Sequence, residues 1–244
     1  MYIENPKTKG SGIYCVIPQA YEPCPRQCKD CYFLNGRSYL EPLEKNLPNM
    51  PPDGICQDFV IRVNDGLDSG HKAGDVIQKT AHFPNKFYNT SYPHKVALLS
   101  EYAPVVLTIN PDPHTDTLFF DQVYDCKPMF VRFRANMWNV KLLDKAIAYW
   151  CYKQKVPLVI TFMRYYNENE QLAKHYNSFY TKKEHILNQS WSINQWGWDL
   201  ILYCFRNNPL VFTCGRDANN HLCKDCGVCL QLYWRSKNEY YLKG

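Results

Sequence analysis

Short apolar runs, each ended by a turn or a proline, recur along most of this chain. Val105–Ile109 (VVLTI) and Leu158–Phe162 (LVITF) are almost entirely apolar, and Phe59–Asn64 (FVIRVN) is rich in β-branched residues. Runs of about four to eight such residues are typical of strands buried on both faces, as in parallel sheets. Between two of these runs, Val140–Lys153 places its apolar residues on one helical face. This alternation of strand and helix signals predicts a parallel α/β sheet.

Other segments continue the pattern. Further strands are expected at Ser11–Ala20, Phe87–Thr90, Met129–Arg134 and Leu210–Thr213, and helices at Ser38–Met50, at Pro93–Glu101 and in the later half of Trp191–Asn207. Right-handed βαβ units in series curl into a full or partial barrel. We therefore expect an α/β protein: a partial (β/α)6-type barrel over residues 1–213, followed by a short cysteine-rich, metal-binding extension over residues 214–244.

Composition limits the class of protein. The chain has 244 residues, 45% of them hydrophobic, which suits one folded α/β domain and argues against global disorder. It has neither a leader-like first segment nor an apolar run of about eighteen residues, so we expect a cytoplasmic protein without a membrane span. The net charge of +5 and the nineteen tyrosines suit contact with nucleic acid. No stripe of lysine and arginine accompanies them, so nucleic acid is a minor alternative as partner.

Seven of the twelve cysteines fall into two close groups. The first group, Cys24-x3-Cys28-x2-Cys31, directly follows the first expected strand. Thiolates are soft ligands that bind iron–sulfur clusters or zinc, and a cluster held by three thiolates leaves one iron without a protein ligand. The alternative is half of a zinc site whose fourth ligand lies elsewhere in the chain. The spacing favours the cluster, because zinc motifs usually repeat Cys-x2-Cys pairs.

This cysteine loop after a first strand resembles that of the radical S-adenosylmethionine (radical SAM) superfamily, whose members carry it in a partial β/α barrel. The resemblance implies a [4Fe-4S] cluster on Cys24, Cys28 and Cys31, with S-adenosylmethionine chelating the fourth iron. It also implies reductive cleavage of this cosubstrate to a 5′-deoxyadenosyl radical, with a reduced flavodoxin or ferredoxin as electron donor. The substrate is unknown, and no catalytic side chain is assigned.

The second group is Cys214-x8-Cys223-x2-Cys226-x2-Cys229, with His221 as an alternative ligand. Four thiolates complete a tetrahedral zinc site or hold a whole [4Fe-4S] cluster, and the spacing alone leaves both open. Many radical SAM proteins carry an auxiliary cysteine cluster after the barrel, and the chain also resembles a small phage-encoded group of radical-SAM-like proteins that ends in one. The resemblance therefore favours iron–sulfur. The remaining cysteines are expected to be small core residues: Cys15, Cys56, Cys126, Cys151 and Cys204.

Polar residues follow several expected strands, where ligands of α/β sheets usually bind. Asp65, Gly66 and Asp68 occupy the position of the superfamily's glycine-rich segment, so the resemblance predicts that they bind the amino group of S-adenosylmethionine. An ordinary polar turn is the alternative. Asn110 suits a ribose hydroxyl, and Arg134 suits a carboxylate or phosphate. Further candidates at strand ends are Asp112, Arg132, Asn136, Arg164 and Tyr165.

Three functions are compatible with these patterns. The first is a radical SAM enzyme that abstracts hydrogen from an unknown substrate. The second is a zinc-binding module that recognises nucleic acid or protein without catalysis. The third is an electron carrier with two iron–sulfur centres, which the three-cysteine ligand set disfavours because carriers normally use four protein ligands per cluster.

Overall fold

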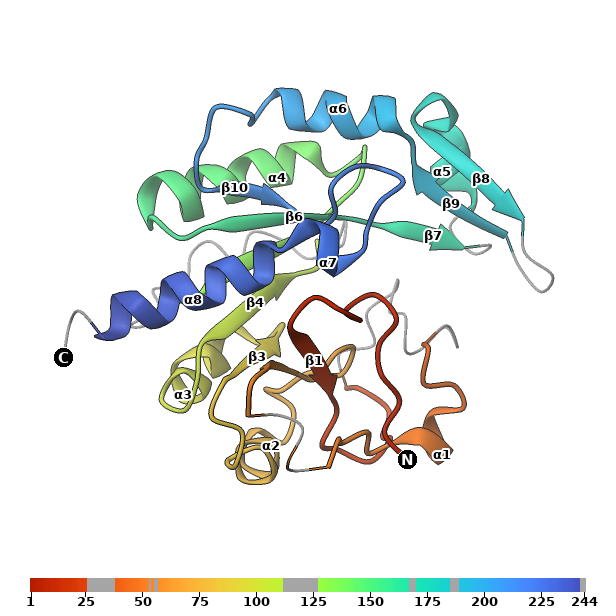
Figure 1. Cartoon of the computed structure of the whole chain (residues 1–244). Coiled ribbons are helices and arrows are strands. Elements are labelled where there is room, and N and C mark those ends of the chain that lie inside the picture. The colour runs from red at the N-terminus through yellow and green to blue at the C-terminus, as the bar shows by residue number, and fades with distance from the viewer. Residues whose placement is uncertain are drawn as a thin grey trace.

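The computed structural model describes residues 1–25, 38–52, 54, 57–111, 127–166, 170–184 and 189–241. It has a mixed α/β fold, in which seven parallel strands form one curled sheet, a half-barrel (Figure 1). In spatial order the strands are β1 (Ile13–Val16), β2 (Val60–Val63), β3 (Lys86–Thr90), β4 (Val105–Ile109), β5 (Phe130–Ala135), β6 (Leu158–Phe162) and β10 (Val211–Thr213). All seven were expected from the sequence.

The outer face of the sheet carries the larger core and the crossover helices. These are α2 (Ala73–Lys79), η2 (Pro93–Lys95), α3 (Val96–Ser100), α4 (Val140–Ile147), η3 (Ala148–Lys153) and α6 (Gln195–Tyr203). Helix α1 (Leu43–Asn46) instead packs in a smaller cluster with Ile17, Leu40 and Leu47. On the outer face, strand residues such as Ile61 and Val131 belong to one core cluster with Leu143, Ile147 and Trp150 of α4 and η3. Each large side chain buried in this way contributes about 1.5–3 kcal/mol, so this face anchors the half-barrel.

Two helical predictions need correction. The helix expected over Ser38–Met50 is reduced to the four residues of α1, which follows Pro42 and ends before Pro48. Proline lacks the amide hydrogen that a helix interior needs, and this accounts for the short element. The polar stretch before Thr80, for which no helix was expected, contains α2. Its buried residues, Ala73 and Val76, are too few to give an amphipathic signal.

A second, three-stranded antiparallel sheet lies between β6 and α6 in the chain and was not expected. It contains β7 (Arg164–Tyr166), β9 (Gln189–Ile193) and β8 (Tyr180–Glu184) in that order, with α5 (Glu170–His175) and η5 (Asn177–Phe179) between β7 and β8. The Trp138 ring lies against those of Tyr165, Tyr176 and Tyr180, so aromatic contacts attach this sheet to the half-barrel.

The inner face of the half-barrel is covered by the C-terminal segment. Helix α7 (Cys223–Cys226) precedes α8 (Val228–Tyr241), and Leu232 and Tyr233 of α8 pack against strand residues such as Val106. Figure 1 shows α4 and α6 on one side of β6 and β10, and α8 on the other. Residues 214–241 therefore contribute to the inner core of the half-barrel. In the described part of the chain, no helix is both long and apolar enough to cross a membrane.

Candidate functional site

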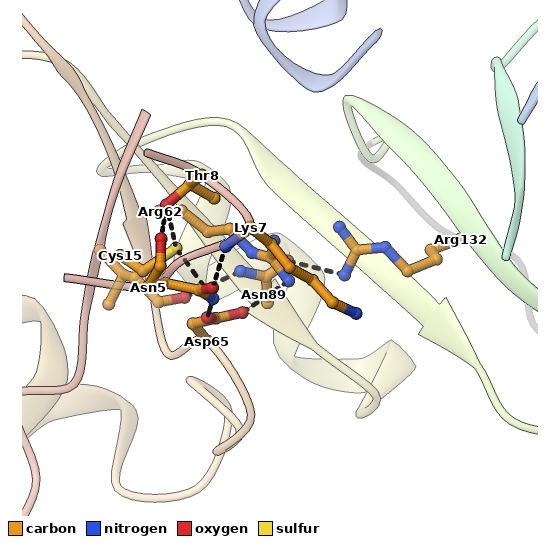
Figure 2. Close-up of polar contacts among 9 residues, drawn as sticks. Asn5, Lys7, Thr8, Cys15, Arg62, Asp65, Asn89 and Arg132 are labelled. Carbon is orange, nitrogen blue, oxygen red and sulfur yellow. Dashed lines mark hydrogen bonds and ion pairs between the residues drawn. The ribbon is translucent and has the colours of Figure 1, made fainter. Parts of the chain in front are cut away.

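Polar side chains line the inner face of the half-barrel beyond the apolar layer that α8 covers. Because side chains alternate along a strand, Arg62 shares a face with the inward-packed Val60, and Arg132 shares one with Phe130. Arg132 Nη1 donates to Asn89 Oδ1 over 3.2 Å. Figure 2 shows this group of polar contacts, with Arg132 reaching across from β5 towards Asn89. The inner face thus carries arginines from β2 and from β5.

Asp65 joins this group just after β2 ends. Asn64, in the left-handed region with φ of 58°, turns the chain there, and Asp65 Oδ1 pairs with Arg62 Nη2 at 2.7 Å. The other carboxylate oxygen accepts a hydrogen bond from the Asn5 amide. Burial acts to raise the pKa of Asp65, but Arg62 and Asn5 together hold that pKa below its usual value. Asp65 is therefore ionised and holds Arg62 in place.

Asp68 closes the loop between β2 and α2 onto the end of β3. Its Oδ1 accepts hydrogen bonds from the Gly70 amide at 2.8 Å and from Thr90 Oγ1 at 2.7 Å. Its Oδ2 accepts from the amide of Ser91 at 2.6 Å and from the hydroxyl at 2.5 Å. Gly66 has φ of 120°, which suits glycine alone among common residues. These contacts fix the conformation of the turn, and the predicted binding of S-adenosylmethionine by its residues stays a prediction.

A pocket of about 130 Å³ lies beside this loop. Its wall includes Cys24, Gln19 and Glu22 from the segment after β1, and His71 and Lys72 from the segment before α2. Gln19 Nε2 donates to the His71 carbonyl at 2.7 Å, whereas Gln19 Oε1 is buried with no partner among the described residues. The structure therefore places Cys24 in a pocket wall where the first two strands end. The other predicted ligands of this group, Cys28 and Cys31, lie outside the described residues.

Asn110 and Arg134 lie together at the ends of β4 and β5. Arg134 Nη1 donates to Asn110 Oδ1 over 3.0 Å. Arg134 is on the same face of β5 as Arg132, as the alternation in the sequence predicts. This pair could bind an anionic or hydroxyl-bearing ligand. Asp112 lies outside the described residues.

Two other strand-end candidates have structural contacts. Asn136 Oδ1 accepts from the Trp138 and Asn139 amides, and its Nδ2 donates to the Tyr165 hydroxyl at 2.6 Å. Arg164 Nε donates to Ser192 Oγ within the second sheet, at 3.1 Å. These residues stabilise the start of α4 and the pairing of β7 with β9.

The second cysteine group comes from three elements. Cys214 follows β10, and Cys229 lies in the first turn of α8. Cys223 and Cys226 are the first and last residues of α7. The Gly215 amide lies 3.4 Å from Cys226 Sγ and donates to it, and the same sulfur lies 3.5 Å from the Thr213 carbonyl. Cys226 is therefore packed against both chain neighbours of Cys214. Cys214 and Cys229 also border the same inner apolar cluster.

Two of these thiols, Cys223 and Cys229, feel the charges of the arginines on β2 and β5. Burial raises the pKa of Cys223 to about 12; Arg62 opposes this rise, whereas Cys214 and Cys229 add to it. Burial also raises the pKa of Cys229, and Arg132 and Arg62 oppose that rise. Among the described residues, no three or more His, Cys, Asp or Glu side chains stand in an arrangement that could hold a metal ion.

His221 supports the loop that carries Cys214. Its Nε2 lies 3.0 Å from the Ala218 carbonyl, and a Cβ at Gly215 would come within 2.7 Å of its Nδ1. Burial lowers the pKa of His221, while the carbonyl groups of Ala218 and Cys214 act to raise it. The ring is therefore packed against backbone groups of the loop.

Sequence reasoning missed the residues at the centre of the polar group: Asn5, Thr8, Arg62 and Asn89. Arg62 could have indicated this group from the sequence, because it is a charged residue inside the β-branched run FVIRVN. Thr8 Oγ1 and Asn5 Nδ2 lie 3.6 and 3.8 Å from the sulfur of Cys15.

The expectation for the scattered cysteines was met in part. Cys15 and Cys151 are buried, but Cys204 is exposed at the end of α6, so its assignment to the core was wrong. Cys56 and Cys126 lie outside the described residues.

No protein-family model, curated protein or solved structure shows significant similarity to the chain.

Proposed function

We propose that this chain is a radical SAM enzyme. Cys24, Cys28 and Cys31 would hold a [4Fe-4S] cluster, which supplies the electron for reductive cleavage of S-adenosylmethionine and so the radical that abstracts hydrogen from an unidentified substrate. One observation carries the proposal. Cys24 lies in the wall of a pocket at the carboxyl end of the first strand of a parallel half-barrel, where α/β proteins bind ligands.

The pocket beside Cys24 has a group that suits an amino-acid cosubstrate. Gln19 Oε1 is a buried acceptor with no partner among the described residues, and such groups are costly to leave unsatisfied. For an ammonium group in the pocket to donate to this oxygen, the Gln19 side chain would have to turn its amide oxygen towards the pocket. Asp65, Gly66 and Asp68 would help by fixing the turn next to the pocket, so that its backbone groups face the cosubstrate.

The inner arginines would bind the anionic parts of the ligands. Arg134 and Asn110 form one polar pair, and Arg132 and Asn89 form another. Guanidinium groups bind carboxylate or phosphate in a two-pronged manner, and the amide oxygens accept from ribose hydroxyls. The protein would thereby orient the cosubstrate and the substrate, and exclude water from the radical.

The test is an anaerobic assay of the iron- and sulfide-reconstituted protein with dithionite and S-adenosylmethionine, in which 5′-deoxyadenosine is measured. We expect production by the unchanged chain and loss in Cys28→Ser. Cys204→Ser is the matched control, because Cys204 is exposed and belongs to neither cysteine group in the sequence, and it should retain production. Reduced flavodoxin or ferredoxin should replace dithionite as the electron donor.

Two results would overturn the proposal. One is the absence of 5′-deoxyadenosine from protein that carries a full iron load. The other is production that Cys28→Ser leaves unchanged. A colourless protein that retains zinc at Cys24, Cys28 and Cys31 would instead support the binding module, and coloured protein without cleavage would support the electron carrier.

A further inference from the structure

We propose that the substrate carries a phosphate monoester, and that Arg132 and Lys7 bind this group on the inner face of the half-barrel. The inference rests on the function proposed above for the reaction, but the phosphate site itself needs neither a cluster nor S-adenosylmethionine. It names the class of substrate that the proposed function leaves open. The site lies in a layer of polar side chains next to the apolar layer that α8 covers.

The inner face of the sheet changes from apolar to polar one layer nearer the carboxyl ends of the strands. In the apolar layer, each of the neighbouring strands β2 to β6 contributes one buried residue: Val60, Phe87, Val106, Phe130 and Val159. Side chains alternate across a sheet, so the residue two positions later on each strand lies on the same face. These residues, the polar layer, are Arg62, Asn89, Thr108, Arg132 and Thr161. The residue between each pair belongs to the hydrophobic core of the outer face. A polar layer of this kind suits a ligand better than core packing.

Arg132 spans the polar layer from β5 to β3. Its Nη1 donates to Asn89 Oδ1 over 3.2 Å, and β4 lies between these two strands in the sheet. The guanidinium therefore extends over the inner face of β4, where Thr108 is paired in register with Arg132. Asn89 is held for this contact, because its Nδ2 donates to the Val63 carbonyl at 2.9 Å and its oxygen thus faces Arg132.

Among the described residues, Arg132 has no carboxylate partner of its own. A guanidinium has five N–H donors, and the described contacts of this one are the Asn89 oxygen and the ring of Phe130, whose centroid lies 5.7 Å from the guanidinium carbon. Asp65 feels the charge of Arg132, but that carboxylate is already paired with Arg62 at 2.7 Å. A half-buried cation is costly to leave without an anion, so Arg132 is suited to bind one that the described chain does not supply.

Lys7 supplies a second cation at the same place. Its backbone is fixed from two sides: the amide donates to Asn5 Oδ1 at 2.9 Å, and the carbonyl accepts from the Cys223 amide at 2.8 Å. The side chain is exposed and has no ion pair with any described residue. Figure 2 shows it extending towards the guanidinium of Arg132. Two like charges that point towards one another repel, and an anion bound between them removes the repulsion.

A phosphate monoester fits these two cations better than a carboxylate does. It carries about two negative charges at neutral pH, whereas a carboxylate carries one. The planar fork of an arginine binds two phosphate oxygens, and a lysine ammonium binds as a point charge. S-adenosylmethionine is itself a net cation, because it has a sulfonium and an ammonium group but a single carboxylate. The two cations therefore favour the substrate over the cosubstrate.

The test is isothermal titration calorimetry with the full chain carrying Cys28→Ser, so that binding is measured without the proposed cluster. Ribose 5-phosphate and AMP are the probes, because sugar phosphates and nucleotides are two sources of a phosphate monoester whose hydroxyl groups suit the polar layer. Ribose and adenosine are the unphosphorylated controls. We expect each monoester to bind about tenfold or more tightly than its control, and the tighter monoester identifies the source.

The two cations are tested by substitution in the same background. Arg132→Gln should weaken binding about ten- to a hundredfold, because it removes charge-assisted hydrogen bonds, and Arg132→Lys should restore part of the loss. Lys7→Gln should weaken binding about threefold, and this exposed position keeps the test valid if Arg132→Gln fails to fold. Lys145→Gln is the matched control, because Lys145 is exposed on α4, on the outer side of the sheet, and should leave binding unchanged.

The proposal is overturned if neither monoester binds more tightly than its unphosphorylated control. It is also overturned if folded Arg132→Gln binds the monoester unchanged or, where that variant does not fold, if Lys7→Gln does so. Tighter binding of citrate or of a short single-stranded oligonucleotide would contradict it as well, since the site would then prefer carboxylates or a phosphodiester chain. Failure of the radical SAM proposal would instead appear as absent 5′-deoxyadenosine in iron-loaded protein, and it leaves these binding results unaffected.

Discussion

Arg62 and Asp65 form an ion pair at the point where β2 leaves the sheet. Arg62 Nη2 lies 2.7 Å from Asp65 Oδ1, and the two side chains are only 20% and 11% exposed. The pair sits among Asn5, Thr8 and Cys15 of the N-terminal segment, as Figure 2 shows. It therefore connects the first residues of the chain to the second strand and to the inner face of the half-barrel.

Changing Asp65 to asparagine should destabilise the protein markedly. The change leaves the Arg62 guanidinium without its carboxylate partner in a largely buried place, and breaking such a pair from one side costs about 3 kcal/mol. The free energy of unfolding in urea measures the effect. Asp75→Asn is the control, because Asp75 pairs with Lys79 on the surface and should cost under about 1 kcal/mol. Equal, small losses in both variants would contradict the buried role of the pair.

The same pair predicts a pH dependence. The pKa of Asp65 is held below 3.8 in the folded chain, so ionised Asp65 stabilises the protein at neutral pH. That stabilisation is fully present above the unfolded value and is lost as the pH falls through the lower folded value. Thermal unfolding from pH 6 down to pH 3 should therefore show the gap between the unchanged chain and Asp65→Asn narrowing at the acid end. A gap that stays constant would mean that Asp65 does not carry this charge.

Asp68→Ala should loosen the loop after β2. The carboxylate accepts four hydrogen bonds from Gly70, Thr90 and Ser91, and their loss leaves partly buried donors unsatisfied, at a cost of about 2–3 kcal/mol. Urea unfolding checks this, with the exposed Asp58→Ala as control. If Asp68 instead contacts the cosubstrate directly, Asp68→Asn should weaken cosubstrate binding and leave the free energy of unfolding unchanged.

The parallel sheet could be predicted from the sequence, because strands buried on both faces are continuous apolar runs. Val105–Ile109 and Leu158–Phe162 form β4 and β6 with the bounds expected for them. The antiparallel sheet could not be predicted from the sequence. Its strand Tyr180–Glu184 (YTKKE) is exposed after its first residue, so it has no buried apolar run, and its partner strand lies just before an expected helix. Such pairing depends on contacts between elements, which local patterns do not encode.

The candidate site was only partly predictable for a related reason. Asp65 and Asp68 were selected by their position after a strand, but their hydrogen-bond partners are Asn5, Thr90 and Ser91, which lie far away in the chain. The local sequence predicts that a polar residue lies at the end of a strand. The hydrogen-bond partners of that residue depend on how the strands pair, which the local sequence does not show. The same holds for Arg132, whose hydrogen-bond partner Asn89 lies on another strand, 43 residues away in the chain.

Leu232→Ala tests whether the C-terminal segment is part of the half-barrel core. Leu232 is 2% exposed and packs in the inner cluster with Val106 and Phe130, so its truncation should cost about 2–5 kcal/mol in the free energy of unfolding. Leu222→Ala is the matched control, since Leu222 is 40% exposed and should cost much less. Urea unfolding followed by both tryptophan fluorescence and circular dichroism should show one transition, shifted to lower urea for Leu232→Ala. An element that shares the core must lose its structure together with the sheet. Two separate transitions, with only the smaller one shifted by Leu232→Ala, would therefore mean that residues 214–241 unfold independently of the sheet.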